Sequence, residues 1–415
     1  MIISLSLVAL AMLSLVGLCQ LLWGWRFARQ YAKARSAPAQ GAWPRVAVLL
    51  PVRGADPSLA DCLRGLIAQN YPDYRVFVIL DSREDPAWNL VTSIAESSGT
   101  GLVQVRILET RRATCSLKLS ALLQMVEELD DSYGVAALID ADVIPHRDWL
   151  RDLVAPLRDP EIGAASGIRW FSPLPSGSWG TLVRYLWNVA ASAYMVALRI
   201  PWGGSLAFRL DALKRSELLG QWSRSLFEDT AVYRAMRKIG LRVAFVPAAT
   251  MVNRESIDLR SCWHFMRRQM LDVHLYHPAG MWILALSTFS ACSMALVPVF
   301  LVVALVQGLW SEAAWLGGGL ALYAMEMVLL VTWIGGRVQR FTLPPGDRVP
   351  SLSLQMLLAL PLTQVIYLLC HLSACYLRKI EWRGVAYEFR GPLEVRMVEY
   401  RPYRGGETDE GTSLV

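Results

Sequence analysis

The segment Val135-Ala-Ala-Leu-Ile-Asp-Ala-Asp142 decides the fold and marks the candidate site. Residues 135–139 are apolar and have the length of a buried strand, and two aspartates follow where that strand ends. Carboxylates this close together repel each other unless a cation or a donor-rich ligand lies between them. Hard oxygen ligands suit Mg²⁺ or Mn²⁺, and these ions in turn suit a diphosphate. Asp140 and Asp142 therefore indicate a divalent-cation site, and the alternative is that they only cap the next turn.

Strand and helix patterns alternate along the chain before this segment. Apolar runs at 46–51, 74–80 and 103–108 resemble buried strands, and residues 59–67, 88–97 and 117–129 have helical patterns. Such alternation predicts an α/β fold with a mostly parallel sheet and helices on both faces. Ligands of such sheets bind beyond the carboxyl ends of the strands. Asp81 ends the second strand, so we expect it near Asp140 and Asp142.

Four long apolar stretches distinguish the chain from ordinary soluble proteins. Its 415 residues are 54% hydrophobic and only 18% charged, with a mean hydropathy of +0.34. A membrane span needs roughly 20 apolar residues, and residues 1–25, 281–310, 313–336 and 352–377 each reach that length. Residues 45–278 hold most of the charge and form the expected soluble domain. Residues 26–44 are expected to be a basic linker, and 378–415 a basic tail.

Basic residues indicate how the chain crosses the membrane. Those that follow the first span are Arg26, Arg29, Lys33 and Arg35. The positive-inside rule therefore places the N-terminus outside and the large domain in the cytoplasm. Three further spans would put the basic tail outside, against the same rule. We therefore expect 352–377, which contains Pro361, to be a re-entrant or interfacial helix.

Charge and cysteine content exclude other classes of protein and site. The net charge of +6 comes without a lysine-rich block, and the basic residues flank apolar stretches, which argues against a nucleic-acid partner. The seven cysteines include no C-x-x-C spacing, so the sequence predicts neither a zinc site nor a disulfide framework. Inside the stretch 313–336, Glu326 is either a functional group or a side chain packed in a helix interface.

Several short motifs occur in a fixed order, most of them between residues 45 and 278. They are Leu49-Leu50-Pro51-Val52-Arg53, Leu80-Asp81, Ser116-Leu117-Lys118, Asp140-Ala141-Asp142, Trp202-Gly203-Gly204-Ser205, Glu228-Asp229 and Arg267-Arg268-Gln269, with Trp382-Arg383-Gly384-Val385-Ala386-Tyr387 in the tail. This order resembles the membrane-bound, inverting family-2 glycosyltransferases, a group that includes ceramide glucosyltransferases and related bacterial lipid glycosyltransferases. The resemblance implies a GT-A domain, which is a Rossmann-like α/β fold with a mostly parallel sheet.

The resemblance also implies a role for each matched residue. Asp81 would bind the nucleoside, Lys118 would lie near the nucleotide, Asp140 would contact the ribose or sugar, and Asp142 would ligate the divalent cation. Gly203, Gly204 and Ser205 would form a backbone-exposed turn against the donor sugar and acceptor, and Asp229 would be the catalytic base. The alternatives are a solvated helix position for Lys118, an ordinary turn at the glycines, and an acid pair at a helix N-terminus for Glu228 and Asp229.

The family pattern (Q/R)-x-x-R-W is incomplete in this chain. Within residues 263–270, the family arginine is either Arg268, followed by Gln269 in the tryptophan position, or Arg267, with His264 three residues before it. Either register keeps a guanidinium for the diphosphate, and neither keeps the aromatic ring expected near the acceptor. The alternative is that both arginines only anchor the chain at the membrane surface.

Together these features predict a hexosyltransferase that is an integral membrane protein with a cytoplasmic catalytic domain. The expected donor is a nucleotide sugar, UDP-hexose, and the expected cofactor is Mg²⁺ or Mn²⁺. The acceptor is expected to be a lipid hydroxyl, which receives one sugar with inversion because a single displacement needs no enzyme nucleophile. The alternatives are a processive polysaccharide synthase and a catalytically inert membrane scaffold that binds nucleotide or lipid.

Overall fold

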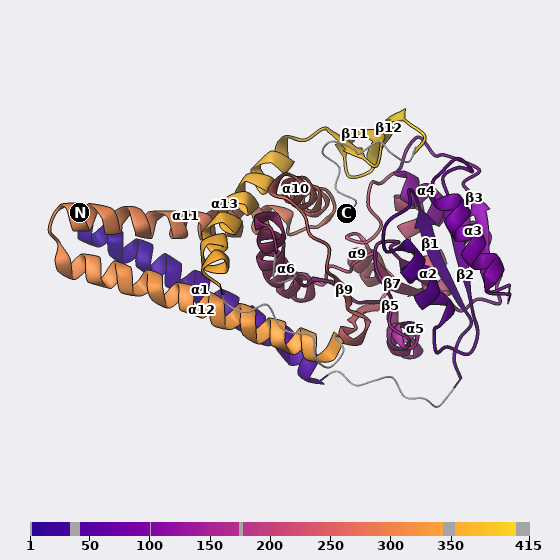
Figure 1. The fold of residues 1–415 in the computed structure, drawn as a ribbon, viewed down its shortest axis with the longest axis horizontal. Coiled ribbons are helices and arrows are strands. Elements are labelled where there is room, and N and C mark those ends of the chain that lie inside the picture. The colour runs from indigo at the N-terminus through magenta and orange to yellow at the C-terminus, as the bar shows by residue number, and fades with distance from the viewer. Residues whose placement is uncertain (1, 34–41, 100, 174–176, 343–352, 404–415) are drawn as a thin grey trace.

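The computed structural model describes residues 2–33, 42–99, 101–173, 177–342 and 353–403 (Figure 1). Residues 34–41 of the expected linker, with Arg35, and 404–415 of the expected tail lie outside the described residues. The described chain forms an α/β domain, a set of long apolar helices and a small sheet near the C-terminus.

A seven-stranded sheet forms the centre of the α/β domain. Its strands have the order β3-β2-β1-β4-β7-β5-β8. They are β1 (Val46–Val52), β2 (Tyr74–Leu80), β3 (Val103–Ile107), β4 (Val135–Ile139), β5 (Ile162–Ser166), β7 (Ser205–Arg209) and β8 (Arg242–Phe245). β1, β2, β3 and β4 are parallel to one another, β8 is parallel to β5, and β7 is antiparallel to β4 and β5. The predicted mostly parallel α/β sheet is therefore confirmed.

Helices cover both faces of this sheet because its central strands are apolar on both sides. Val46, Val48 and Leu50 of β1 pack in one core with α2, α3 and α5, whereas Ala47 and Leu49 pack in the other with α4. The helices of the domain are α2 (Leu59–Ile67), α3 (Ala87–Ser97), α4 (Leu117–Glu127), α5 (Trp149–Val154), α7 (Leu210–Arg215), α8 (Leu218–Trp222) and α9 (Val232–Lys238), with 3₁₀ turns at Ala155–Arg158 and Pro247–Ala249. A two-stranded parallel sheet, β6 (Arg169–Phe171) with β9 (Met251–Asn253), lies beside the main one.

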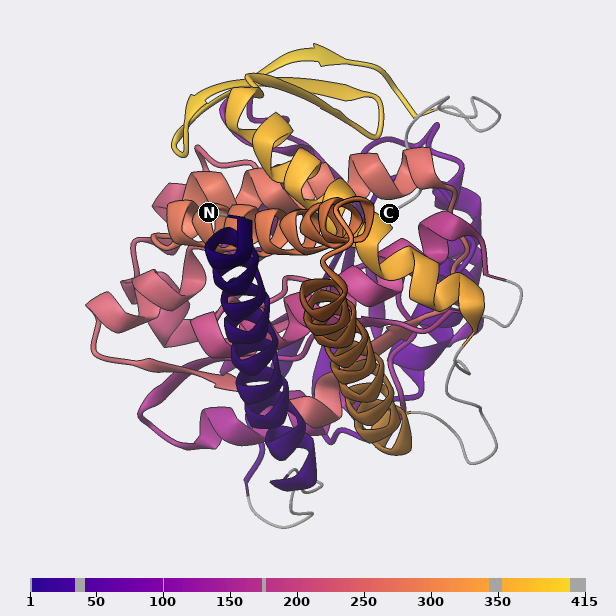
Figure 2. The ribbon, with the colours of Figure 1, turned by 90° about the vertical axis from the view of Figure 1, so that its left-hand side faces the viewer.

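In the described part of the chain, four helices are long and apolar enough to cross a membrane. They are α1 (Ile2–Lys33), α11 (Gly280–Val306), α12 (Trp310–Thr342) and α13 (Leu354–Tyr376). Figures 1 and 2 show that α1, α11 and α12 extend away from the α/β domain as an elongated bundle. In contrast, α13 lies across the domain end of this bundle and packs against α6 (Trp179–Leu198) and α10 (Leu259–Tyr276), which are also crosswise to the bundle.

Two segment boundaries differ from the expected ones. α1 continues to Lys33, beyond the expected end at residue 25, because the basic residues after the apolar stretch are good helix formers that extend a helix toward the headgroups. α12 likewise continues past residue 336 to Thr342.

Glu326 lies at the interface of α12 with α1, where a Cβ on Gly17 would be 2.5 Å from its carboxylate oxygen. This position agrees with the packed alternative for Glu326.

Most of the expected basic tail is a folded sheet, which corrects the sequence-based prediction. Its antiparallel strands are β10 (Lys379–Trp382), β11 (Val385–Gly391) and β12 (Glu394–Tyr400). Val385, Tyr387 and Phe389 alternate along β11 and are buried in the same core as α4. Alternation of this kind is the pattern of a half-buried strand, so the C-terminal sheet packs as part of the α/β domain.

Candidate active site

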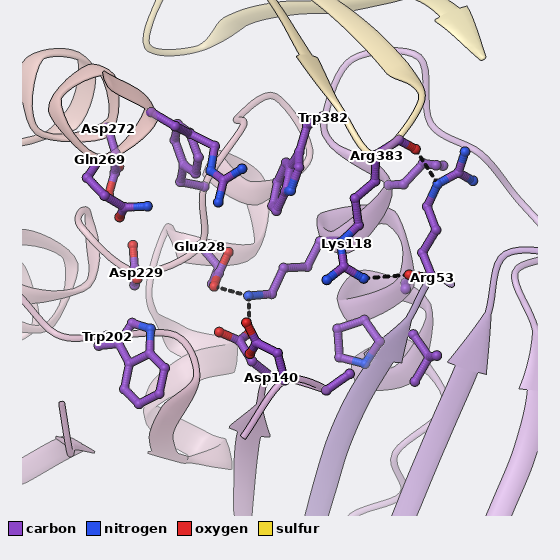
Figure 3. A pocket seen from close by; sticks show the side chains of 18 of the residues that line it. Arg53, Lys118, Asp140, Trp202, Glu228, Asp229, Gln269, Asp272, Trp382 and Arg383 are labelled. Carbon is purple, nitrogen blue, oxygen red and sulfur yellow. Dashed lines mark hydrogen bonds and ion pairs between the residues drawn. The ribbon is translucent and has the colours of Figure 1, made fainter. Parts of the chain in front are cut away.

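A pocket of about 220 Å³ opens at the carboxyl ends of β1, β2 and β4 (Figure 3). Side chains from α6 and α10 line it on the side of the helix bundle, and side chains of the C-terminal sheet line it on another side. The predicted site residues that line it are Asp81, Lys118, Asp140, Asp142, Asp229, Arg268 and Gln269. The fold therefore brings together residues that are far apart in the sequence.

Arg169 of β6 bridges the two aspartates of the D-x-D pair. Its guanidinium donates to the two oxygens of Asp142 at 2.7 and 2.8 Å and to Asp140 Oδ2 at 2.9 Å. Lys118 Nζ donates to the other oxygen of Asp140 at 2.6 Å. Burial alone would raise the pKa of Asp140, but Lys118 and Arg169 hold it below its usual range. The pair therefore does not simply cap a turn.

These carboxylates fit a divalent cation in charge and in donor type. Arg169 lies between them as their counter-ion, so a cation that binds both would take the place of the guanidinium. Within the described ranges, no group of three or more His, Cys, Asp or Glu side chains could hold a metal ion. A cation at Asp140 and Asp142 would therefore take further ligands from a bound diphosphate and from water.

Lys118 also connects the D-x-D pair to Glu228. Its Nζ donates to Glu228 Oε1 at 2.5 Å, and its side chain is only 18% exposed. Burial favours the neutral amine, yet the charges of Asp140 and Glu228 raise the pKa of Lys118 above its ordinary value. Lys118 is thus a buried cation of the pocket, and the solvated alternative is wrong. The Ser116 side chain accepts a hydrogen bond from the Leu119 N–H and so fixes the start of α4, which carries Lys118.

Asp229 lies at the end of the pocket nearest α10. Its Oδ2 accepts a hydrogen bond from the Gly203 N–H at 2.8 Å, which joins two of the predicted motifs. Burial, followed by the negative charge of Glu228, raises the pKa of Asp229 to about 7. A carboxylate whose pKa is near neutrality can accept a proton efficiently at physiological pH.

A second carboxylate, Asp272 of α10, belongs to the same end of the pocket (Figure 3). Thr230 Oγ1 donates to Asp272 Oδ2 at 2.6 Å and lies 3.4 Å from Asp229 Oδ1. Burial and then the charge of Asp229 raise the pKa of Asp272 well above its ordinary value. Because two adjacent buried carboxylates do not both ionise readily, Asp272 keeps its proton at the pH where Asp229 ionises.

Gly203 and Gly204 form a turn that leaves no space for side chains. A Cβ on Gly203 would lie 1.9 Å from Glu228 Oε1. A Cβ on Gly204 would lie 2.1 Å from the Trp202 ring and 2.5 Å from Asp140 Oδ2. The glycines are therefore required for the close approach of this turn to the acidic residues of the pocket.

Ser205 differs from its expected position. It is completely buried in β7, where its Oγ accepts from the Trp149 indole N–H and donates to the Ala249 carbonyl, each at 2.9 Å. It does not line the pocket. Ser205 therefore supports the glycine turn from behind, and its expected contact with the donor sugar is not formed by its side chain.

The C-terminal sheet places an aromatic ring beside the arginine motif, whose own sequence lacks one. Arg268 and Gln269 line the pocket, whereas Arg267 does not, which favours the register with Arg268 as the family arginine. The Arg268 guanidinium lies 5.3 Å from the centroid of the Trp382 ring. Burial and the nearby charge of Arg383 lower the pKa of Arg268 to about 10, so it remains cationic at neutral pH. Trp382 thus supplies an aromatic ring next to the arginine.

Asp81 lies at the opposite end of the pocket and is engaged by three side chains. Arg53 forms an ion pair with it, Arg111 Nε donates to its Oδ1 at 3.2 Å, and the Tyr400 hydroxyl donates to its Oδ2 at 2.8 Å. The Arg111 guanidinium also lies 4.3 Å from the centroid of the Tyr400 ring. The predicted nucleoside end therefore includes arginines and a tyrosine in addition to Asp81.

Sequence reasoning missed several pocket residues. Arg169 and Asp272 have no local signal, because only the fold brings them to the D-x-D pair and to Asp229. The tail motif contained the signal for the C-terminal sheet, since Trp382, Arg383 and Tyr387 all line the pocket. The sheet is held there by a hydrogen bond from the Leu117 N–H to the Tyr387 hydroxyl at 3.0 Å.

The model of glycosyl transferase family 21 matches residues 9–392. The chain belongs to this family. Its fold is similar to that of the mannosyltransferase PcManGT from Pyrobaculum calidifontis, solved in complex with GDP-Man and Mn²⁺, with a TM-score of 0.55 and 21% identity over 81% of this chain and 98% of that one. Glucosyl-3-phosphoglycerate synthase from Mycobacterium tuberculosis, solved with phosphoglyceric acid, is 15% identical over 54% of this chain and 80% of that one, with a TM-score of 0.34.

Family membership and fold agree with the chemistry of the pocket. The family 21 chain is a glycosyltransferase with a GT-A fold, and it transfers a sugar from a nucleotide-sugar donor. The prediction of a glycosyltransferase is therefore confirmed, and the alternative of an inert scaffold is set aside.

Proposed function

We propose that this family 21 enzyme transfers a single sugar from UDP-hexose to a lipid hydroxyl at the cytoplasmic leaflet, with inversion. The position of Asp229 carries this proposal. It lies between Lys118 and Asp272 of α10 (Figure 3), and α10 is followed directly by the apolar helix α11. A hydroxyl that approaches from the membrane side would therefore meet Asp272 and Asp229 before it meets the D-x-D pair.

Charge is distributed along the pocket as the transfer requires. The cations Lys118, Arg169 and Arg268 line the part where the diphosphate would lie. When the bond between the anomeric carbon and the diphosphate breaks, negative charge develops on the leaving group, and these side chains stabilise it. The two acids on the other side, Asp229 and Asp272, face the acceptor.

The reaction is a single displacement. The acceptor oxygen forms a bond to the anomeric carbon while the bond from that carbon to the diphosphate oxygen breaks, and Asp229 takes the proton of the acceptor hydroxyl. Because no enzyme nucleophile intervenes, the anomeric centre is inverted. The Gly203 N–H holds the Asp229 carboxylate so that its other oxygen is available for the proton.

The proposed cofactor is Mg²⁺ or Mn²⁺, held by Asp142 with Asp140 beside it. When bound, the cation would neutralise charge on the diphosphate. Arg169 would then leave Asp142, and its guanidinium would be free to bind a phosphate oxygen.

The proposed membrane arrangement has three spans: α1, α11 and α12. α12 has 33 residues, or about 50 Å at 1.5 Å per residue, which exceeds a hydrocarbon core of about 30 Å. α13 would lie in the interface with α6 and α10, as its crosswise position suggests (Figure 2). With the N-terminus outside, both the GT-A domain and the C-terminal sheet are cytoplasmic, and the conflict with the positive-inside rule disappears.

A product assay tests the proposal. Purified protein would receive radiolabelled UDP-glucose, UDP-galactose or GDP-mannose with a total lipid extract, and the products would be separated and identified by mass spectrometry. A lipid that carries one hexose is expected from the wild-type protein and not from Asp229→Asn. A polymer would instead support the processive synthase, and a labelled product only in the aqueous phase would contradict a lipid acceptor.

A further inference from the structure

An apolar cavity lies on the other side of α6 from the sugar-transfer pocket. It has a volume of about 120 Å³ and is lined by α1, α6, α11 and α13. A smaller cavity of about 60 Å³ continues from it toward α12, and the two share Ala190, Tyr194 and Gln364 in their walls. Both cavities thus lie where the proposed spans meet the interfacial helices.

Trp187 connects this cavity with the sugar-transfer pocket. Its side chain lines both of them, and its ring packs edge-on against Phe265, with centroids 5.7 Å apart. Trp187 is 8% exposed, and its indole nitrogen has no hydrogen-bond partner among the residues that the structure describes. A buried donor without an acceptor indicates a missing ligand or water, because such groups are normally paired.

The cavity also reaches the outer surface of the helix bundle. Trp282, at the start of α11, lines the cavity and is 78% exposed. In the proposed arrangement this residue lies at the membrane boundary, where tryptophan is common. The cavity therefore has one end at the lipid phase and the other at Trp187.

We propose that this cavity holds a hydrocarbon chain of the lipid acceptor, with the polar head group beside Trp187 and the reacting hydroxyl in the pocket. The inference rests on the proposed function, since it requires a lipid acceptor. The apolar walls bind the chain, and the Trp187 N–H donates to an oxygen of the head group. A chain anchored in this way would present its hydroxyl to Asp229 from the side opposite the cationic residues.

Filling the cavity tests the proposal. Ala190→Phe places a ring in the wall shared by the two cavities, and Val302→Phe places one on the outward face of α11, where Val302 is 58% exposed. The acceptors would be diacylglycerols and ceramides, each supplied with C8 and with C16 acyl chains. The measured quantity is the ratio of kcat/KM for C16 to that for C8, because the ratio within one variant is independent of the fraction of active protein.

We expect Ala190→Phe to lower this ratio at least tenfold, and Val302→Phe to leave it as in the wild type. Trp187→Phe keeps the ring but removes the N–H, so it should raise the KM for the lipid about fivefold, which corresponds to the roughly 1 kcal/mol of one hydrogen bond. Its KM for the nucleotide sugar should not change.

Two failures can be distinguished. If the wild-type enzyme glycosylates a lipid and Ala190→Phe discriminates between chain lengths as the wild type does, the cavity holds only a structural lipid and the inference is wrong. If the wild-type enzyme glycosylates a water-soluble acceptor and none of the lipids, the proposed function is wrong, and the inference is wrong with it.

Discussion

The Gly203 N–H donates a hydrogen bond to Asp229 at 2.8 Å, and the Gly203 Cα is so close to Glu228 that a Cβ would lie 1.9 Å from its Oε1. One backbone position thus orients the proposed base, Asp229, and packs against Glu228. Burial and then the charge of Glu228 raise the pKa of Asp229. The turn connects the donor side of the pocket with the acceptor side.

Gly203→Ala should therefore disrupt both acids. Because the added Cβ must displace Glu228, we expect transfer to fall at least 100-fold and the melting temperature to fall by several degrees. Gly220→Ala in α8 is the control, since a Cβ there meets nothing within 4 Å and alanine favours a helix. Thermal unfolding and sugar transfer would be measured for both. Near wild-type transfer by Gly203→Ala would show that the turn tolerates a side chain and is not a fixed part of the site.

Asp229→Asn separates catalysis from donor binding. The amide keeps the acceptor for the Gly203 N–H but cannot take a proton, so transfer should fall by about 10² to 10⁴-fold while nucleotide-sugar affinity is retained. Asp73→Asn, an exposed carboxylate 62% accessible, is the matched control and should behave as the wild type. Rapid transfer by the Asn variant would remove Asp229 from the role of base.

The same substitution should stabilise the fold at alkaline pH. The pKa of Asp229 is raised from 3.8 to about 7 in the folded protein, so the unfolded chain ionises first as the pH rises. The free energy of unfolding therefore decreases as the pH rises from about 4 to about 7, and it stays at the lower value above pH 7. We expect Asp229→Asn to melt at a higher temperature than the wild type at pH 8, with a smaller difference at pH 4. Equal differences at both pH values would contradict the raised pKa.

Asp272→Asn should change the pH dependence of transfer. The rate should rise with pH as Asp229 ionises near pH 7. Asp272 keeps its proton in this range, because burial and the charge of Asp229 raise its pKa well above the ordinary value, and its ionisation at higher pH brings a second negative charge beside Asp229. The amide does not titrate, so the variant should keep the rising limb of kcat/KM near pH 7 and lose the second, alkaline limb. A purely structural role for Asp272 would lower the rate at every pH and leave both limbs in place. The pH profiles of the two proteins therefore decide between these roles.

The sequence predicted the parts of the site that follow strands and lie in short motifs. Asp81 and Asp140 come directly after apolar runs, so their place at the edge of a parallel sheet follows from local pattern. Arg169 and Asp272 reach the pocket from β6 and α10, and no local spacing relates them to their partners. The predicted contact of Ser205 with the donor sugar was wrong for its side chain. A motif shows only which residues are neighbours in the sequence, whereas the direction of a side chain depends on the strand to which it belongs.

The number of long apolar helices could be predicted from hydropathy, but their orientation relative to the bundle could not. Hydropathy identifies 352–377 as apolar and cannot tell whether the helix continues the bundle or lies across it. The expectation of a re-entrant or interfacial helix there came from the basic residues that follow it. The C-terminal sheet was missed because its basic residues suggested a tail, although Val385, Tyr387 and Phe389 alternate as a half-buried strand does.

Removal of divalent cations tests the role of Asp142. Transfer should stop in excess EDTA and return with Mn²⁺ or Mg²⁺, and Asp142→Ala should lower transfer at least 100-fold because the cation loses its main protein ligand. The control is Asp131→Ala, which removes a fully exposed carboxylate paired with Lys214. Undiminished turnover in EDTA would mean that Arg169, which already bridges Asp140 and Asp142, replaces the metal in this enzyme.

Cysteine labelling in intact cells tests the three-span arrangement. In a Cys292→Ser background, Glu84→Cys lies in the GT-A domain, Arg396→Cys in the C-terminal sheet, and Gln307→Cys between α11 and α12, and all three positions are exposed. Because α11 and α12 are joined at the far end of the bundle from the domain, an impermeant maleimide should label only Gln307→Cys from outside. The other two should react only after the membrane is permeabilised. Labelling of Glu84→Cys or Arg396→Cys in intact cells would place the catalytic domain outside and reverse the proposed topology.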